Sequence, residues 1–296
     1  MNQVKTWIHC GSAYHAGYTG KGIGVAVLDT GIFPHVDFDH RIVAFTDMVH
    51  KKRMPYDDNG HGTHISAIIG GSGAASDGRY QGIAPECSLI SVKVLDDKGN
   101  GFASDVMAGL NWIRYHREEL GIRIVNISVG SFNKRGMSEN SALVKAVNAA
   151  WDDGLVVVVA AGNQGPKPMT ITTPGISRKV ITVGCSDDDK EVNVMGNKMV
   201  DYSGRGPTSA CICKPDIVAP GSSIISCSNK AGRYTVKSGT SMSTPLVSGA
   251  IALLLEKYPY MVNRDVKLML RERAVDLGLP RNQQGWGLLD VGRLLK

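Results

Sequence analysis

Three polar residues stand in settings where each could take part in catalysis. Asp29 ends a short apolar run and is followed by a glycine turn. His61 lies between two glycines, which leave its imidazole room to approach a partner, and Ser241 precedes a long apolar run. A carboxylate, an imidazole and a hydroxyl can act together as orienting acid, general base and nucleophile. These residue types therefore indicate chemistry in which a serine is activated for covalent attack.

The elements around these residues would bring them to one place. The apolar run before Asp29 is typical of a buried parallel strand, and sites in open α/β sheets lie beyond the carboxyl ends of such strands. Residues 246–255 are apolar on almost every side and predict a buried helix with Ser241 near its N-terminus. There, the free N–H groups and the positive end of the helix dipole would stabilise an oxyanion.

Each residue also has a purely structural interpretation. Ser241 or Thr240 could serve only as a helix N-cap, and Asp29 could only form a turn. His64, three residues after His61, suggests zinc, but the metalloprotease pattern needs histidines four residues apart with a glutamate between them. The segment has no such glutamate, so no metal is expected there.

The chain order Asp29, His61, Ser241 is one of three known orders of this triad. The motifs that carry it are Val27-Leu-Asp-Thr-Gly-Ile32, His61-Gly-Thr-His64, Gly239-Thr-Ser-Met-Ser-Thr-Pro245 and Ala160-Ala-Gly-Asn163. With these motifs in order, the chain resembles the subtilisin-like (subtilase) serine proteases over roughly residues 7–289. Residues 162–166 and 171–175 are similar to bacterial intracellular subtilases in particular.

The resemblance implies a serine endopeptidase that acts on peptides or proteins. Asp29 would orient His61, His61 would take the proton of Ser241, and the Asn163 amide with the Ser241 N–H would bind the oxyanion. An extended substrate would pair with two exposed segments, and a third would form the far wall of the pocket for the residue before the scissile bond. The matching positions are Gly99, Asn100 and Gly101; Ser128, Val129 and Gly130; and Ala160, Ala161 and Gly162.

These pocket segments carry no charge, which predicts broad specificity with an apolar or aromatic preference before the scissile bond. Asp57 and Asp58 could favour a basic residue one position further back, although a surface turn of paired acids is the stronger interpretation. A processing peptidase for one partner protein remains an alternative function. A non-catalytic scaffold is a further alternative, which the intact triad disfavours.

Length and patterning predict a single α/β domain over residues 1–296, with three α/β/α layers around a mostly parallel sheet. The 43% hydrophobic content and the 35 glycines suit a large core with many tight turns. A helix is expected over residues 104–120, and two surface helices after residue 257 are expected to flank a turn at 285–287. The expected strands are residues 24–29, 89–94, 122–128, 155–160 and 180–184.

Charge and cysteine content bear on the setting of the chain. The net charge of +6 is spread along the sequence, so we expect no nucleic-acid partner, and we expect six free thiols. The N-terminus lacks the features of a signal peptide and no segment suits a membrane span, so a cytoplasmic enzyme is expected, with secretion after processing as the alternative.

Neither a cofactor nor a metal is expected to take part in the chemistry. Structural calcium, common in the family, would be sought in residues 71–82, where Asp77 is the only acidic residue.

Subtilases are commonly made with an N-terminal pro-segment, for which the residues before Asp29 leave no room. Whether the sequence is a processed catalytic domain or a form that folds unaided stays open.

Overall fold

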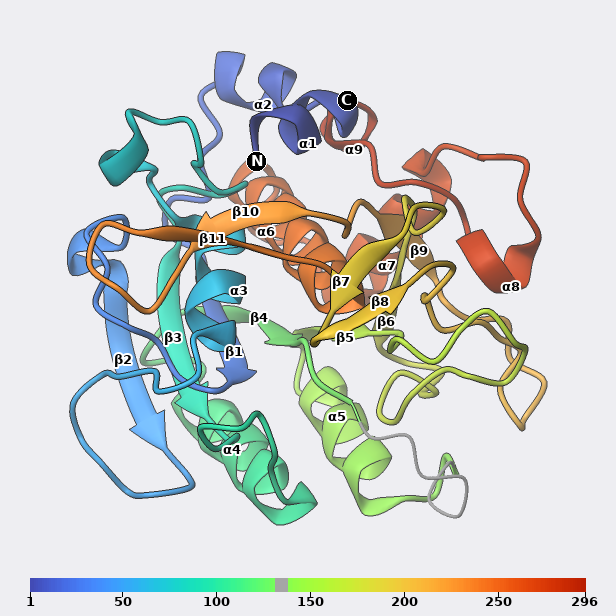
Figure 1. The fold of residues 1–296 in the computed structure, drawn as a ribbon, viewed down its shortest axis with the longest axis horizontal. Helices are drawn as coiled ribbons and strands as arrows, with labels where there is room; N and C mark the ends of the chain where they lie inside the picture. The colour runs from blue at the N-terminus through green and yellow to red at the C-terminus, as the bar shows by residue number, and fades with distance from the viewer. Residues whose placement is uncertain (131–137) are drawn as a thin grey trace.

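A seven-stranded sheet forms the centre of the protein in the computed structural model, which describes residues 1–130 and 138–296 (Figure 1). Every pair of neighbouring strands in it is parallel. In spatial order the strands are β2 (Ile42–Asp47), β3 (Ser88–Lys93), β1 (Gly24–Asp29), β4 (Ile122–Ile127), β5 (Val156–Ala160), β6 (Ile181–Cys185) and β9 (Ile217–Ala219). Two antiparallel hairpins lie outside this sheet, β7 (Val192–Val194) with β8 (Asn197–Met199) and β10 (Ile224–Cys227) with β11 (Tyr234–Lys237).

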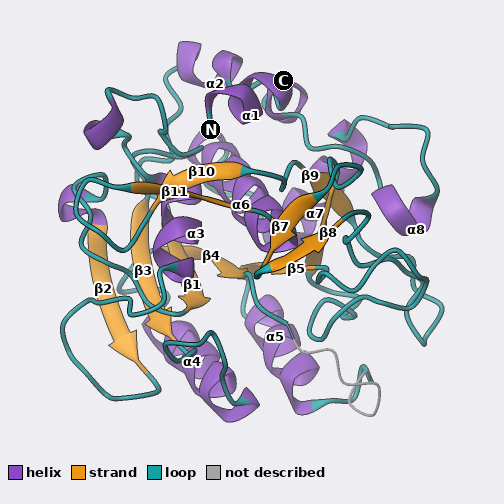
Figure 2. Ribbon diagram, in the orientation of Figure 1, coloured by secondary structure: helices purple, strands orange, loops and turns teal. Residues whose placement is uncertain are grey.

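Helices surround the sheet, as the colouring by secondary structure makes clear (Figure 2). The longest is α6 (Thr240–Lys257), whose residues are buried along nearly its whole length. The other α-helices are α1 (Asn2–Trp7), α2 (Gly11–His15), α3 (His61–Gly70), α4 (Ala103–His116), α5 (Ala142–Asp152), α7 (Asn263–Arg273), α8 (Arg281–Gln284) and α9 (Val291–Leu294). Two short 3₁₀ helices are η1 (Asp39–Arg41) and η2 (Ala74–Ser76).

The helices cover both faces of the sheet. Helix α3 packs with α6, and α4 packs with α5. Successive side chains of a strand point to opposite faces, and in β1 Asp29 reaches His61 of α3 while Leu28 lies against Gly109 of α4. The two helix pairs therefore lie on opposite faces, which confirms the predicted three-layer α/β/α architecture.

Strand β1 is the point where the strand order reverses. The chain leaves β1 toward β2 on one side and leaves the neighbouring β4 toward β5 on the other, so the two connections diverge at the carboxyl ends of β1 and β4. In open α/β sheets such a switch point leaves a crevice where ligands bind. Asp29 is the last residue of β1 and therefore stands at this crevice.

The five predicted strands all belong to the sheet, with ends shifted by one residue at most. Strands β2 and β9 were not predicted, because β2 is a partly exposed edge strand without a continuous buried run and β9 has only three residues. The helix expected over 104–120 ends at His116, and a turn leads from there to Gly121 with φ +59°.

The C-terminal part departs further from expectation. Three helices rather than two follow residue 257, because the 11-residue α7 precedes the two short helices α8 and α9 that flank the turn at 285–287. The N- and C-terminal helices lie together (Figure 1), and Val291 N–H donates to the Ile8 carbonyl at 2.8 Å. Within residues 1–130 and 138–296, no helix combines the length and the apolar character that crossing a bilayer requires.

Candidate active site

The Asp29 carboxylate and the His61 imidazole form a short hydrogen bond. Asp29 Oδ1 lies 2.7 Å from His61 Nδ1 and also accepts from the Thr30 N–H at 2.8 Å. The Asp29 side chain is fully buried, whereas His61, the first residue of α3, keeps 21% of its side chain exposed. In the neutral tautomer that carries its proton on Nδ1, Nδ1–H donates to the carboxylate and Nε2 is the acceptor that could serve as a base.

Ser241 is the accessible residue at the start of α6. From Thr240 to Leu255, every residue except Ser241 is buried. The Ser241 hydroxyl donates to the Ser128 carbonyl at 2.7 Å, so it is engaged with the segment after β4 rather than with His61. Catalytic hydrogen bonds are often not aligned before substrate binds. A rotation of the hydroxyl away from Ser128 is therefore needed before His61 can take its proton.

Asn163 is tied to the first turn of the same helix. Its Oδ1 accepts from the Thr240 N–H and from the Thr240 hydroxyl, both at 3.0 Å. The Thr240 hydroxyl in turn accepts from the Gly162 N–H at 3.1 Å. With its oxygen held in this way, Asn163 can present its NH₂ group beside Ser241, whose own N–H lies in the first turn and has no intrahelical partner.

Asp57 connects the end of β1 to the start of α3. Its carboxylate accepts from the Thr30 hydroxyl at 2.9 Å, the Gly60 N–H at 2.8 Å, and the Thr63 N–H and hydroxyl at 2.9 and 2.6 Å. Burial by itself raises the pKa of Asp57, but the hydrogen bonds from Thr63, Gly60 and Thr30 outweigh burial and lower it. The expectation that Asp57 lies in a surface turn is wrong, because its side chain is buried and these donors belong to buried residues around Asp29 and His61.

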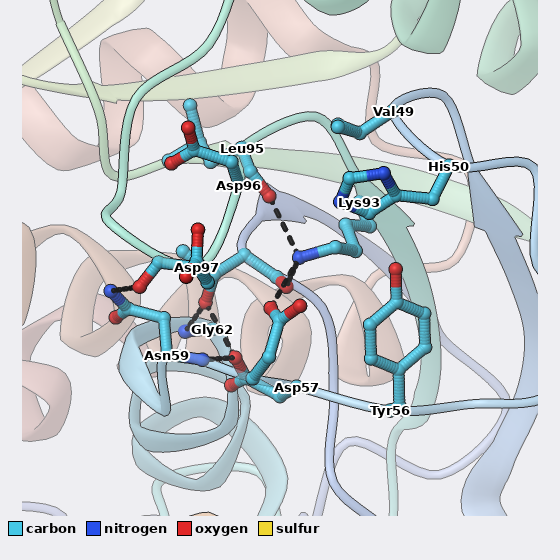
Figure 3. A network of polar contacts seen from close by, with 12 residues as sticks. Val49, His50, Tyr56, Asp57, Asn59, Gly62, Lys93, Leu95, Asp96 and Asp97 are labelled. Carbon is cyan, nitrogen blue, oxygen red and sulfur yellow. Dashed lines mark hydrogen bonds and ion pairs between the residues drawn. The ribbon is translucent and has the colours of Figure 1, made fainter.

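Lys93 is a buried residue next to the candidate site that the sequence analysis missed. Its ammonium group is completely buried and donates to the Thr30 carbonyl at 2.6 Å, the Leu95 carbonyl at 2.8 Å and Asp58 Oδ1 at 2.7 Å (Figure 3). These three bonds use all three ammonium protons. Lys93 therefore fixes the backbone directly after Asp29 together with the start of the loop that leads to Gly99. A lysine inside an otherwise apolar strand run was the signal that could have revealed it.

The first two predicted substrate segments both line an uncharged cavity of about 320 Å³. Their members that line it are Gly99, Asn100, Gly101, Val129 and Gly130. The remaining lining residues are Leu95, Ala103, Val106, Ile127, Leu143 and Pro174. An extended peptide that enters between the segments would thus find an uncharged recess beside it.

The third predicted segment, residues 160–162, lies outside this cavity. Ala160 and Ala161 are buried and do not line this cavity. Thr172 separates the segment from Ser128–Gly130: a Cβ on Gly130 would lie 2.4 Å from Thr172 Oγ1, and one on Gly162 would lie 2.3 Å from its Cγ2. The predicted pocket between these segments is consequently narrowed by the buried Thr172 side chain, which the sequence analysis had not considered.

His64 does not contribute a metal site. It is completely buried in α3, and its Nε2 lies 3.2 Å from the Ile224 carbonyl and 3.3 Å from that of Thr235. Burial lowers the pKa of His64 to about 3, with the nearby Lys237 and His61 as further causes. The residue therefore stays neutral and anchors the β10–β11 hairpin against α3.

The loop at residues 71–82 offers one carboxylate, that of Asp77, and it is exposed. Other oxygen ligands for a calcium ion there would have to come from backbone carbonyls or side-chain hydroxyl or amide groups. Asp37 holds the loop through Ser72 N–H to its carbonyl at 2.9 Å and Ala75 N–H to its Oδ1 at 3.0 Å. Asp37 therefore contributes both its carbonyl and its carboxylate to holding this loop.

Comparison with known proteins decides the family. The profile of the subtilase family matches residues 20–287. This chain belongs to the subtilase family. Serine protease AprX of Bacillus subtilis (strain 168) is 45% identical over 270 residues, which make up 86% of this chain but only 61% of AprX. Subtilisin DY of Bacillus licheniformis is 35% identical over 280 residues, 93% of this chain and 91% of that protein.

A solved structure of the same family has the same fold. Sphericase superposes on this chain with a TM-score of 0.76 at 32% sequence identity, and the match covers 92% of each chain. The family and its named members are serine proteases, so the chain belongs to that enzyme class. Subtilases need no cofactor for catalysis.

Replacing Asn163 tests whether its amide serves catalysis or only holds Thr240. Asn163→Ala is expected to lower kcat by about 10²–10³ with little change in KM, a magnitude carried over from subtilisin itself rather than calculated for this chain. Asn163→Asp is the matched control, because it keeps an oxygen acceptor for Thr240 but removes the donor. Both variants should lose kcat when rates are measured on active-site-titrated protein. Near-parent kcat in Asn163→Asp would show that Asn163 is only structural.

Proposed function

We propose that this subtilase is an endopeptidase that cleaves peptide bonds through Asp29, His61 and Ser241. The observation that carries the proposal is the 2.7 Å bond between a fully buried Asp29 and His61, with Ser241 as the accessible residue at the start of the neighbouring helix α6. A buried carboxylate orients the imidazole and stabilises its protonated form. The same carboxylate remains ionised throughout the cycle.

Substrate binding would itself prepare the nucleophile. The Ser128 carbonyl, which accepts from the Ser241 hydroxyl, lies in a segment proposed to pair with the substrate main chain. A substrate N–H that takes this acceptor would release the hydroxyl, which then donates to His61 Nε2. The freed Ser241 Oγ attacks the scissile carbonyl carbon while its proton moves to Nε2.

The remaining steps follow from the same groups. The Asn163 amide and the Ser241 N–H would stabilise the oxyanion of the tetrahedral intermediate. His61 then delivers its proton to the leaving amine as the C–N bond breaks, and an acyl-enzyme remains on Ser241. Water, deprotonated by His61, would hydrolyse this ester and restore the serine.

The recess supports broad specificity for uncharged side chains. The cavity of about 320 Å³ between the segments at 99–101 and 128–130 is lined largely by apolar residues. We propose that Thr172, between Gly130 and Gly162, limits the size of the residue before the scissile bond. Acidic residues there would lose hydration without gaining a partner.

The cysteines bear on the setting of the enzyme. All six cysteines are free thiols, four of them buried, which supports a reducing, cytoplasmic location.

A processing peptidase for one partner protein is the second candidate function. The narrowing of the substrate pocket by Thr172 favours this function over that of a wholly unselective enzyme. Cleavage-site profiling over a peptide library separates the two, since a processing enzyme would accept one sequence and a general protease many.

Ser241→Ala tests the proposed nucleophile. The variant should fold normally but lose peptide hydrolysis and labelling by a sulfonyl fluoride, because only the reactive hydroxyl is removed. Ser12→Ala, at an exposed serine on α2, is the matched control and should keep both properties. Mass spectrometry of the labelled chains gives the stoichiometry. Equal labelling of Ser241→Ala and the parent would rule Ser241 out.

Shortening Thr172 tests the proposed limit on specificity. In the series Thr172→Ser, Thr172→Ala and Thr172→Gly, the ratio of kcat/KM for substrates with Phe to those with Ala before the scissile bond should rise stepwise. The expected overall gain is roughly tenfold or more, the usual size of an effect from one or two carbons in a pocket. Asp and Glu substrates should stay the poorest throughout. An unchanged ratio across the series would place that pocket away from Thr172.

A further inference from the structure

His35, Asp37 and Cys227 form a buried cluster that the catalytic mechanism does not use. His35 and Asp37 lie between β1 and η1, and Cys227 ends β10. His35 is 2% exposed, and Asp37 and Cys227 are completely buried. Imidazole, carboxylate and thiol groups are the three ligand types that zinc takes in proteins. Among the described residues, this is the group of three such side chains whose ligand atoms converge.

The distances between the ligand atoms match those around one tetrahedral ion. His35 Nδ1 lies 3.5 Å from Cys227 Sγ and 3.5 Å from Asp37 Oδ1, and Cys227 Sγ lies 3.3 Å from Asp37 Oδ2. Bonds of about 2.0–2.3 Å at tetrahedral angles separate the ligand atoms by roughly 3.3–3.6 Å. An ion could therefore be accommodated with only small movements of these side chains.

The charges in the cluster also favour a divalent cation. Asp37 is a buried carboxylate that accepts from the Ala75 N–H and the Tyr234 hydroxyl, and His35 Nδ1 lies 3.5 Å from its Oδ1. A divalent ion would add a compensating positive charge beside this carboxylate. A divalent ion bound by one carboxylate, one thiolate and one neutral imidazole has no net charge. Such a site can be buried without leaving an uncompensated charge.

We propose that His35 Nδ1, Asp37 and Cys227 Sγ bind a zinc ion that stabilises the fold. Binding breaks the Cys227 S–H bond, forms a bond from the sulfur to zinc and releases one proton to solvent. The sulfur and nitrogen ligands favour zinc over calcium, which prefers oxygen ligands only. Asp37 would supply one oxygen, either Oδ1 near His35 or Oδ2 near Cys227, so the cluster offers three protein ligands.

The ion would join three parts of the chain around the active site. The segment with His35 and Asp37 follows Asp29 at the end of β1, and Asp37 also holds the loop at residues 71–82 through Ala75. Strand β10, which carries Cys227, packs on α3, and the β10–β11 hairpin leads into α6 and Ser241. Zinc at this point would raise the thermal midpoint and resistance to unfolding without entering the chemistry.

The same residues also form a hydrogen-bonded network that needs no metal. The Cys227 thiol donates to Asp37 Oδ2, and the Tyr234 hydroxyl donates to the same oxygen at 2.8 Å. His35 Nδ1 accepts from the Asp37 N–H at 3.2 Å, a hydrogen bond that zinc would replace. This arrangement is the alternative that the experiment must separate from zinc binding. The two differ in whether a metal is held through the Cys227 sulfur.

The test is to produce the full chain in cells supplied with zinc or with cobalt. Metal supplied during synthesis can enter while the chain folds, which matters because all three ligands are buried. Ser241→Ala serves as the background, so that autolysis does not interfere. We expect one metal per chain by mass spectrometry, a near-ultraviolet thiolate-to-cobalt band and a higher thermal midpoint than after metal removal by a chelator.

Two variants identify the ligand. Cys227→Ser should abolish the band and weaken zinc binding by more than about 100-fold. Loss of a residue that only hydrogen-bonds a metal ligand weakens binding by up to about 100-fold, so a larger loss indicates that Cys227 is itself a ligand. Cys211→Ser/Cys213→Ser removes the exposed Cys-x-Cys pair and should keep the band. No stoichiometric metal or no thiolate band in the Ser241→Ala chain would overturn the proposal, whether or not the variants fold. An unchanged band in Cys227→Ser would also overturn it.

Discussion

The hydrogen bond between Asp29 and His61 is the contact on which the active site depends. It forms because Asp29 ends the central strand β1, at the switch point of the parallel sheet, and His61 begins helix α3 on the face toward which Asp29 points. The buried carboxylate would be costly without its donors. The bond therefore stabilises one tautomer of His61 and at the same time fixes the start of α3 against the sheet.

A surrounding polar network keeps this bond in place. Asp57 collects donors from Thr30 on one side and from Gly60 and Thr63 on the other, so it joins the end of β1 to the first turn of α3. The Lys93 ammonium group donates to the Thr30 carbonyl, directly after Asp29, and is itself paired with the Asp58 carboxylate. Networks of this kind in a low-dielectric interior resist rearrangement because each lost bond leaves a buried polar group unsatisfied. The network thus holds the end of β1, with Asp29, against the start of α3, with His61.

The sequence predicted those features whose signal lies within one short stretch of the chain, and missed those that depend on contacts between distant residues. Continuous apolar runs predicted five strands of the sheet, and short motifs predicted Asp29, His61, Asn163 and Ser241, which the structure brings to one edge. Thr172 could not be predicted, because it acts through contacts with Gly130 and Gly162, which are distant in sequence. The burial of Asp57 was missed for a similar reason, since its donors come from both sides of a turn that looks hydrophilic in sequence. Edge strand β2 lacked the pattern of a fully buried strand.

The pH dependence of the acylation rate tests the coupling of Asp29, His61 and Ser241 most directly. Burst kinetics with an ester substrate measure this step separately from deacylation. The rate should fall about tenfold per pH unit on the acidic side through one ionisation, because protonated His61 cannot accept the serine proton. Asp29→Asn should lower the plateau rate by about 10⁴, the size of the effect when the orienting carboxylate is lost. A rate that is flat from mildly acidic to neutral pH, or unchanged by Asp29→Asn, would contradict a mechanism built on this contact.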